Sequence, residues 1–131
     1  MADQKIDIRA RSPWSTLTET EALSISPGKE MINSTITIPG SKSLTNRALI
    51  IAALAEGTSK ISDVLKSDDS FWCIDTLKKL GIDIEIQNET VWIRGNGGRW
   101  QSNDLYIGAA GTIARFLPGA LATSGEGEWK I

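Results

Sequence analysis

Hydrophobic and polar residues alternate along several short stretches of this chain, which is the pattern of a β-strand with one buried face. The clearest cases are residues 82–86 and 90–94, and the polar residues 87–89 between them predict a hairpin. Weaker alternation or short apolar runs predict further strands, which we expect at residues 5–10, 23–25, 35–38, 61–65, 105–107 and 128–131. Turns are expected at residues 27–29 and 95–98.

Three other stretches carry apolar residues at helical spacing and predict helices over residues 43–56, 69–80 and about 111–123. Gly57 and Gly81 are natural stops for the first two. Ser41 or Ser43 can cap the first helix, and Ser67 or Asp68 the second. Residues 11–21 predict a loop in which Trp14 is a packing anchor.

Charges at the second predicted helix follow its dipole, with Asp68 and Asp69 at the start and Lys78 and Lys79 at the end. The acidic pair also has the chemistry of a metal ligand, but capping explains it, so we expect no metal site. Pro118 inside the third predicted helix removes a hydrogen bond at a typical cost of about 3 kcal/mol, and the sequence gives no reason for it.

The turn before the first helix has the chemistry of an anion site. Residues 40–47 read Gly-Ser-Lys-Ser-Leu-Thr-Asn-Arg, so a predicted strand leads into a helix through a turn of small polar residues. The first amides of a helix lack intrahelical partners and carry partial positive charge. Lys42 adds a cation, and Arg47 lies one helical turn after Ser43. The alternative interpretation is a capped helix with two solvated cations.

A weak internal repeat favours the anion site. An offset of 68 residues places Gly40 on Gly108, Arg47 on Arg115, Leu49 on Leu117, Ala52 on Ala120 and Gly57 on Gly125. Duplicated units predict two equivalent helix N-termini. The second copy offers backbone amides and one hydroxyl from Thr112, and Gly111 lets a compact ligand approach the backbone.

Composition narrows the chemistry. The 131 residues suit one globular domain or part of one, and the net charge of −2 gives no reason to expect nucleic acid as a partner. The chain has no histidine, so acid–base steps need Lys, Asp, Glu or groups outside it. Cys73 alone makes neither a zinc site nor an intrachain disulfide and is expected to be buried.

The longest apolar run, residues 48–55, is too short to cross a bilayer, which needs about 20 residues. The N-terminus has no signal-peptide core. We therefore expect no membrane association and a cytoplasmic location.

The motif Pro39-Gly-Ser-Lys-Ser-x-x-Asn-Arg47 resembles the N-terminal signature of the 5-enolpyruvylshikimate-3-phosphate (EPSP) synthase family. The resemblance covers about residues 22–131, because four further motifs follow in the family's order: Ser67-Asp-Asp69, Leu80-Gly-Ile82, Gly95-Asn-Gly-Gly98 and Gly108-x-Ala-Gly-Thr112. It implies an α/β fold built from βαβαββ units, the inverse α/β barrel of the enolpyruvyl transferases. Residues 31–131 would form a partial domain, with one unit and the start of a second. Residues 1–30 would be an N-terminal segment with short strands.

The resemblance also implies an activity. These enzymes transfer the enolpyruvyl group of phosphoenolpyruvate to the 5-hydroxyl of shikimate 3-phosphate, release phosphate, use no cofactor or metal, and are usually monomeric. By this resemblance Lys42, Ser43 and Arg47 hold shikimate 3-phosphate, while Lys42, Gly111 and Thr112 contact phosphoenolpyruvate. Arg115 matches a family arginine that either touches ligand or supports the loop.

The chain departs from the family in two ways. Ala109 stands where the family usually has Asn, which removes one polar contact. Family members are more than three times as long, and their later carboxylates and lysine handle proton transfer. We therefore expect an N-terminal fragment that holds no catalytic residue and is inactive alone.

Two other functions are alternatives to the EPSP synthase activity. A UDP-N-acetylglucosamine enolpyruvyl transferase shares the fold but has a Gly-Ala-Lys-Asn-like start. A non-catalytic anion-binding or interaction module is a further alternative. A nucleotide-binding P-loop or dinucleotide site fails, because neither glycine-rich turn has the required pattern.

Overall fold

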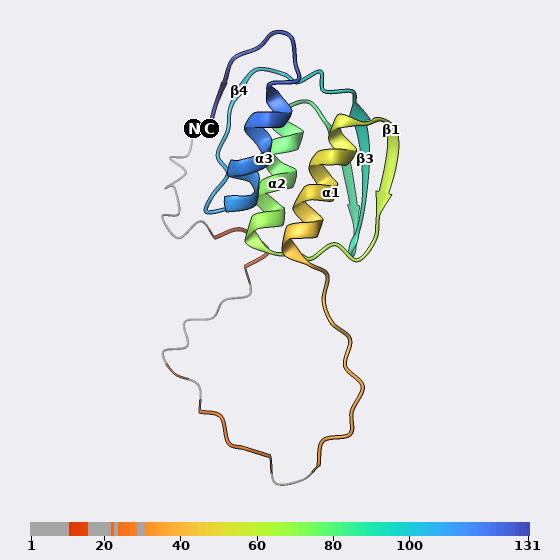
Figure 1. Ribbon diagram of the computed structural model, residues 1–131, viewed down its shortest axis with the longest axis vertical. Coiled ribbons are helices and arrows are strands. Elements are labelled where there is room, and N and C mark those ends of the chain that lie inside the picture. Colours follow the sequence, from red (N-terminus) through yellow and green to blue (C-terminus); the bar gives the residue numbers. More distant parts are fainter. Residues whose placement is uncertain (1–10, 16–21, 23, 29–30) are drawn as a thin grey trace.

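A computed structural model describes residues 11–15, 22, 24–28 and 31–131. Its elements (Figure 1) are α1 (Lys42–Leu54), β1 (Glu56–Ile61), α2 (Asp68–Lys79), β2 (Asp83–Gln87), β3 (Thr90–Asn96), β4 (Asn103–Asp104), α3 (Gly111–Leu121) and β5 (Trp129–Lys130). The strand predicted at residues 5–10 lies outside the described residues, as does Leu23 of the strand predicted at 23–25. The rest of that second strand is wrong, because residues 24 and 25 form no strand and Ile25 is 84% exposed. None of the helices in the described ranges has the length and apolar character to cross a membrane.

β1, β2 and β3 form one antiparallel sheet in the order β1-β3-β2. Val91 pairs with Ile61 on one side and Ile86 on the other. Val91 and Ile93 are fully buried, whereas Trp92 between them faces outward under the ammonium group of Lys60. The predicted hairpin and its alternation are therefore confirmed.

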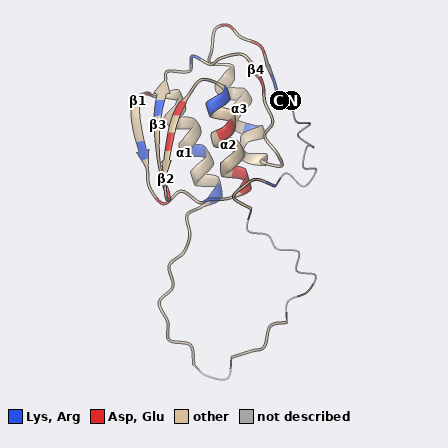
Figure 2. Cartoon of the chain, turned by 180° about the vertical axis from the view of Figure 1, so that it is seen from behind, with Lys and Arg blue, Asp and Glu red and all other residues tan. Residues whose placement is uncertain are grey.

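The three helices lie side by side, and their N-termini are at the same end of the molecule (Figure 1). α1 is central, since it contacts α2, α3 and the sheet. The core fills the space between these layers, and Leu49, Leu77, Ile113 and Leu117 are its largest fully buried apolar side chains on the helices. Charges of both signs are interspersed over strands and helices (Figure 2), so positive charge acts locally rather than as a broad patch.

The helix starts follow the expected caps. Ser41 caps α1, and Ser67 caps α2 in a reciprocal capping box with Ser70. Trp14 is the predicted packing anchor, because its ring meets Phe71 edge-on at 5.5 Å between centroids.

Two predicted strands are wrong near the first helix. Residues 35–38 form no strand, and Ile36 and Ile38 are 78% and 80% exposed. A strand needs a hydrogen-bonded neighbour, and no described strand lies beside this segment, which extends away from the helices (Figure 1). The strand expected at 61–65 is instead β1. α1 ends at Leu54 with Ala55 as its C-cap. Gly57 does not stop the helix but lies inside β1 with φ of +89°.

Two further elements lie at other positions than the sequence predicts. The strand expected at 105–107 is replaced by β4, two residues earlier, which pairs in parallel with β5. The turn expected at 95–98 begins later, because β3 continues to Asn96. Gly95 is needed within β3, since an added Cβ would collide with the carbonyl oxygens of Ala52 and Ala55. Pro118 lies within α3, and the structure does not explain its presence.

The described elements therefore supply α1-β1-α2-β2-β3 of one βαβαββ unit, followed by α3 as the helix of the next. The first strand of the unit, expected at 35–38, is the part that the structure does not form.

Candidate functional site

The turn into α1 is held tightly against the loop that follows β1. Gly40 packs on the carbonyl of Asp63 so closely that any Cβ at this position would collide with it. Thr45, in the first turn of α1, accepts a hydrogen bond from the Leu65 amide at 3.2 Å. Ser41 accepts one from the Leu44 amide at 3.4 Å. The start of α1 is thus fixed by one close backbone contact and by two hydrogen bonds that side-chain hydroxyls accept.

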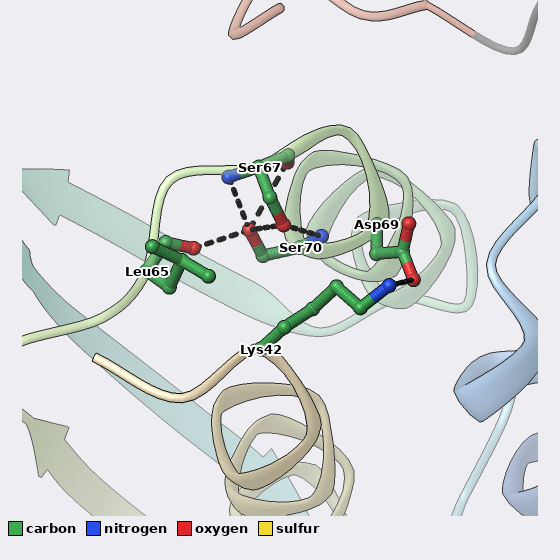
Figure 3. Close-up of polar contacts among 5 residues, drawn as sticks. All are labelled: Lys42, Leu65, Ser67, Asp69 and Ser70. Atoms are coloured by element: carbon green, nitrogen blue, oxygen red, sulfur yellow. Dashed lines mark hydrogen bonds and ion pairs between the residues drawn. The ribbon is translucent and has the colours of Figure 1, made fainter. Parts of the chain in front are cut away.

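Lys42 does not stand alone at this helix start. Its ammonium group lies 3.1 Å from the carboxylate of Asp69 in the first turn of α2 (Figure 3). The Lys42 side chain is 51% exposed and that of Asp69 18%. Sequence reasoning assigned Asp69 to the helix dipole and missed this pairing, because the partner lies on another helix. An anion that binds Lys42 has to share or displace Asp69.

A capping network fixes the start of α2, the turn that carries Asp69 (Figure 3). The Ser70 amide donates to the Ser67 hydroxyl at 3.3 Å, and the Ser67 amide donates to the Ser70 hydroxyl at 2.9 Å. The Ser70 hydroxyl in turn donates to the carbonyl of Leu65. Asp68 accepts two hydrogen bonds from Ser12, at 2.7 Å from its amide and 2.6 Å from its hydroxyl. Both carboxylates of the acidic pair therefore have structural partners.

Arg47 points to the opposite side of α1 from Lys42. Its guanidinium carbon lies 5.3 Å from the centre of the Phe116 ring on α3. Arg47 is exposed, and Ser43, one turn earlier on the same helix face, is partly buried. The two cations therefore flank the first turns of α1, one toward α2 and the other toward α3.

The first turn of α3 leaves backbone amides available. Its cap residue Ala110 offers no side-chain acceptor, and the Gly111 amide turns back to the carbonyl of Ala109 at 2.9 Å. The Thr112 amide has no backbone partner among the described residues. Gly111 is exposed, and no atom lies within 4 Å of where its Cβ would stand. This open space would accommodate a small ligand, and the ligand contact expected at this glycine stays a prediction.

Asn46 is a polar residue of the motif to which sequence reasoning gave no role. Its side chain is fully buried in α1, and neither its Oδ1 nor its Nδ2 atom has a hydrogen-bond partner. The signal was present, since Asn46 occupies a position that helical spacing assigns to the core with Leu49, Ile50 and Ala53.

Burial and geometry bear on two further possibilities, a reactive thiol and a metal site. Cys73 is 1% exposed, and burial raises the pKa of its thiol to about 12, so it is an inert core residue as expected. Among the described residues, no three His, Cys, Asp or Glu side chains gather in a group that could hold a metal ion.

Comparison with known proteins shows to which family the chain belongs. The model of the EPSP synthase family (3-phosphoshikimate 1-carboxyvinyltransferase) matches residues 27–130. A 3-phosphoshikimate 1-carboxyvinyltransferase 2 of Halalkalibacterium halodurans is 55% identical over 127 residues, which are 97% of this chain and 28% of the relative. A 3-phosphoshikimate 1-carboxyvinyltransferase of Ralstonia pickettii is 45% identical over 114 residues, or 85% of this chain and 26% of the relative.

Solved structures of this family have the same fold as this chain. The EPSP synthase from Acinetobacter baumannii superimposes with a TM-score of 0.64 at 32% identity, over 72% of this chain and 22% of that one. The fold is thus a partial EPSP synthase fold, and the chain spans about a quarter of the length of the relatives named above. The family match, the sequence identities and the shared fold together show that the chain belongs to the EPSP synthase family.

Proposed function

We propose that this chain forms the part of a 3-phosphoshikimate 1-carboxyvinyltransferase that holds the anionic groups of shikimate 3-phosphate and phosphoenolpyruvate. The observation that carries the proposal is the gathering of three helix N-termini at one end of the molecule, with Lys42 and Arg47 on either side of α1 (Figure 1). Helix N-termini and basic side chains together stabilise phosphate and carboxylate groups.

Each predicted residue has a distinct task. Lys42, Ser43 and Arg47 bind shikimate 3-phosphate, with Arg47 giving a two-pronged contact and Ser43 a hydroxyl. Lys42 also reaches phosphoenolpyruvate, which rests on the Thr112 amide beside the open space at Gly111. Ala109 supplies no polar side chain to this loop, so backbone amides carry the contact there.

The contribution to catalysis is placement and charge neutralisation. Two polyanions repel each other, and fixed positive groups lower the free energy of bringing the 5-hydroxyl to the enolpyruvyl carbon. Protonation of the enol methylene makes that carbon cationic, and the 5-hydroxyl attacks it and loses its proton to a base. Loss of a proton from the new methyl group and of phosphate from the same carbon then restores the enol ether. The chain has no histidine, and we assign the acid and base for these steps to groups outside the 131 residues.

The relatives' names favour the shikimate reaction over the nucleotide-sugar reaction. A non-catalytic anion-binding module remains a second candidate, favoured by the small share of the relatives' length that the chain spans. We further propose residues 31–131 as the domain unit, with residues 1–30 as an N-terminal segment, and a monomer acting in the cytoplasm.

Calorimetric titration with shikimate 3-phosphate tests the proposal. The chain should bind the ligand with an affinity that falls with salt, because the contacts are ionic. Lys42→Ala should weaken binding at least tenfold, whereas Lys60→Ala, on the outer face of the sheet, should leave it unchanged. Absence of binding, or equal loss in both variants, would reject the proposed site. A separate assay of turnover, in the chain alone and with the remaining sequence of a relative joined to it, distinguishes an enzyme part from a binding module.

A further inference from the structure

Arg47 and Lys42 have different neighbours, although both lie in the first two turns of α1. The ammonium group of Lys42 pairs with the carboxylate of Asp69 at 3.1 Å. Among the described residues the guanidinium group of Arg47 has no carboxylate partner, and its carbon lies instead 5.3 Å from the centre of the Phe116 ring on α3. Of the two cations, Arg47 is therefore the one whose charge no described carboxylate neutralises.

An aromatic ring holds a cation in a different way from a carboxylate. A carboxylate accepts hydrogen bonds from the N–H groups of a guanidinium, so it occupies the donors that an incoming phosphate needs. A ring attracts the guanidinium through its electron-rich face and accepts none of these strong hydrogen bonds. The contact with Phe116 therefore restrains Arg47 and leaves its fork of donors available to an anion.

The ring of Phe116 lies at the edge of the core rather than inside it. Phe116 is 43% exposed, whereas its neighbour Leu117 is 1% exposed. Phe116 and Arg47 line the same hollow between α1 and α3, whose other residues are mostly apolar, such as Ile50 and Ile51. The attraction between a cation and a ring is stronger where the pair is partly desolvated, so this apolar lining strengthens the contact.

We propose that Phe116 is a positioning residue, whose ring holds the guanidinium group of Arg47 ready for the phosphate group of shikimate 3-phosphate. The ring limits the rotamers of the long arginine side chain, so that binding an anion costs less conformational entropy. The contact also joins α1 to α3, the helix that carries Gly111 and Thr112. This inference rests on the proposed function, in which Arg47 binds shikimate 3-phosphate.

Phe116→Leu removes the ring, keeps an apolar side chain and tests the inference directly. In calorimetric titrations of the 131-residue chain, this variant should bind shikimate 3-phosphate about threefold to fivefold more weakly, as expected for the loss of a partly exposed contact between a cation and a ring. Phe116→Tyr keeps a ring and should bind within about twofold of the unmodified chain. The melting temperature of Phe116→Leu should be unchanged or slightly higher, because the ring is only partly buried and leucine favours a helix more than phenylalanine does.

A double-mutant cycle shows whether Phe116 acts through Arg47. Arg47→Gln should itself weaken binding about tenfold, because it removes the charge that meets the phosphate. In the Arg47→Gln background, Phe116→Leu should cause no further loss, because the cation that the ring positions is already gone. Ile51→Ala is the matched control, since Ile51 lines the same hollow and is exposed, and this truncation should leave affinity unchanged.

The outcomes separate the inference from the proposed function. If the unmodified chain binds and Phe116→Leu binds equally well, the inference is overturned and the proposed function stands. The inference is also overturned if Phe116→Leu causes the same loss with and without Arg47, or if Phe116→Tyr or Ile51→Ala loses as much affinity as Phe116→Leu. If Arg47→Gln binds as tightly as the unmodified chain, the role of Arg47 is wrong and the inference fails with it. If the unmodified chain itself does not bind shikimate 3-phosphate, the proposed function fails and the inference that rests on it fails too.

Discussion

The ammonium group of Lys42 lies 3.1 Å from the carboxylate of Asp69, so the first turns of α1 and α2 are joined by an ion pair at the centre of the candidate site. Lys42 is half exposed, and such pairs contribute little to stability, typically about 0–1 kcal/mol. The main effect of the ion pair is to set the position of Lys42, the lysine that we propose binds the anion.

Asp69→Asn should therefore strengthen binding of shikimate 3-phosphate by a few fold, because it removes a negative charge that competes for Lys42. The free energy of unfolding should fall by at most about 1 kcal/mol. Calorimetry and urea denaturation measure the two effects. Asp75→Asn, which breaks the 2.9 Å pair with Lys79, is the control and should not change affinity. A tenfold loss of affinity in Asp69→Asn would show that the carboxylate is needed to orient Lys42.

Gly40→Ala should destabilise the fold by about 1–3 kcal/mol, since the added methyl collides with the Asp63 carbonyl and the backbone must shift. The measurement is urea denaturation followed by tryptophan fluorescence. Gly119→Ala is the opposite case, because Gly119 lies inside α3 with open space around it, and it should stabilise the fold by about 0.5–1 kcal/mol. Equal effects of the two substitutions would contradict the close approach at Gly40.

Ser67→Ala should cost about 1 kcal/mol of unfolding free energy, since it removes the cap that closes the box with Ser70. Ser41→Ala should cost less, because its hydrogen bond to Leu44 is long, at 3.4 Å, and exposed. Thermal unfolding by circular dichroism compares them. A larger loss for Ser41→Ala would mean that α1 depends on its cap more than the geometry indicates.

Stability should fall at alkaline pH because of Cys73. Burial raises the pKa of the folded thiol to about 12 from 9.0, so only the unfolded chain ionises between these values. The folded state then holds one more proton, and its relative stability falls by up to about 1.4 kcal/mol per pH unit. The stabilising contribution is complete below pH 9 and is lost as pH rises toward 12. Cys73→Ala should show a shallower decline in this range by denaturation. Parallel declines in the two proteins would contradict the effect.

Local signals predicted the helices and the hairpin. The serines before α1 and α2 and the alternation around Val91 and Ile93 specify structure through neighbours in sequence. The strand at 35–38 failed because a strand also depends on a partner elsewhere in the chain, and alternation alone does not supply one. The helix stop predicted at Gly57 was wrong for a related reason, because a glycine with a positive φ can lie within a strand such as β1 as well as at the end of a helix.

The candidate site was predicted in part for the same reason. The motif and its helix start were visible, because a helix N-terminus is a local feature. The partner of Lys42, the ring beneath Arg47 and the burial of Asn46 all arise from the packing of α1 against α2 and α3, which no spacing along the chain reveals.

The most direct test of the account is a nuclear magnetic resonance titration of the 15N-labelled chain with shikimate 3-phosphate. We predict saturable shifts of the Ser43 and Thr112 amides, in the first turns of α1 and α3, and none at Lys60 and Trp92 on the sheet. Shifts confined to the sheet, or no saturable shift at either helix start, would contradict the claim that this end of the helix layer binds the anionic substrates.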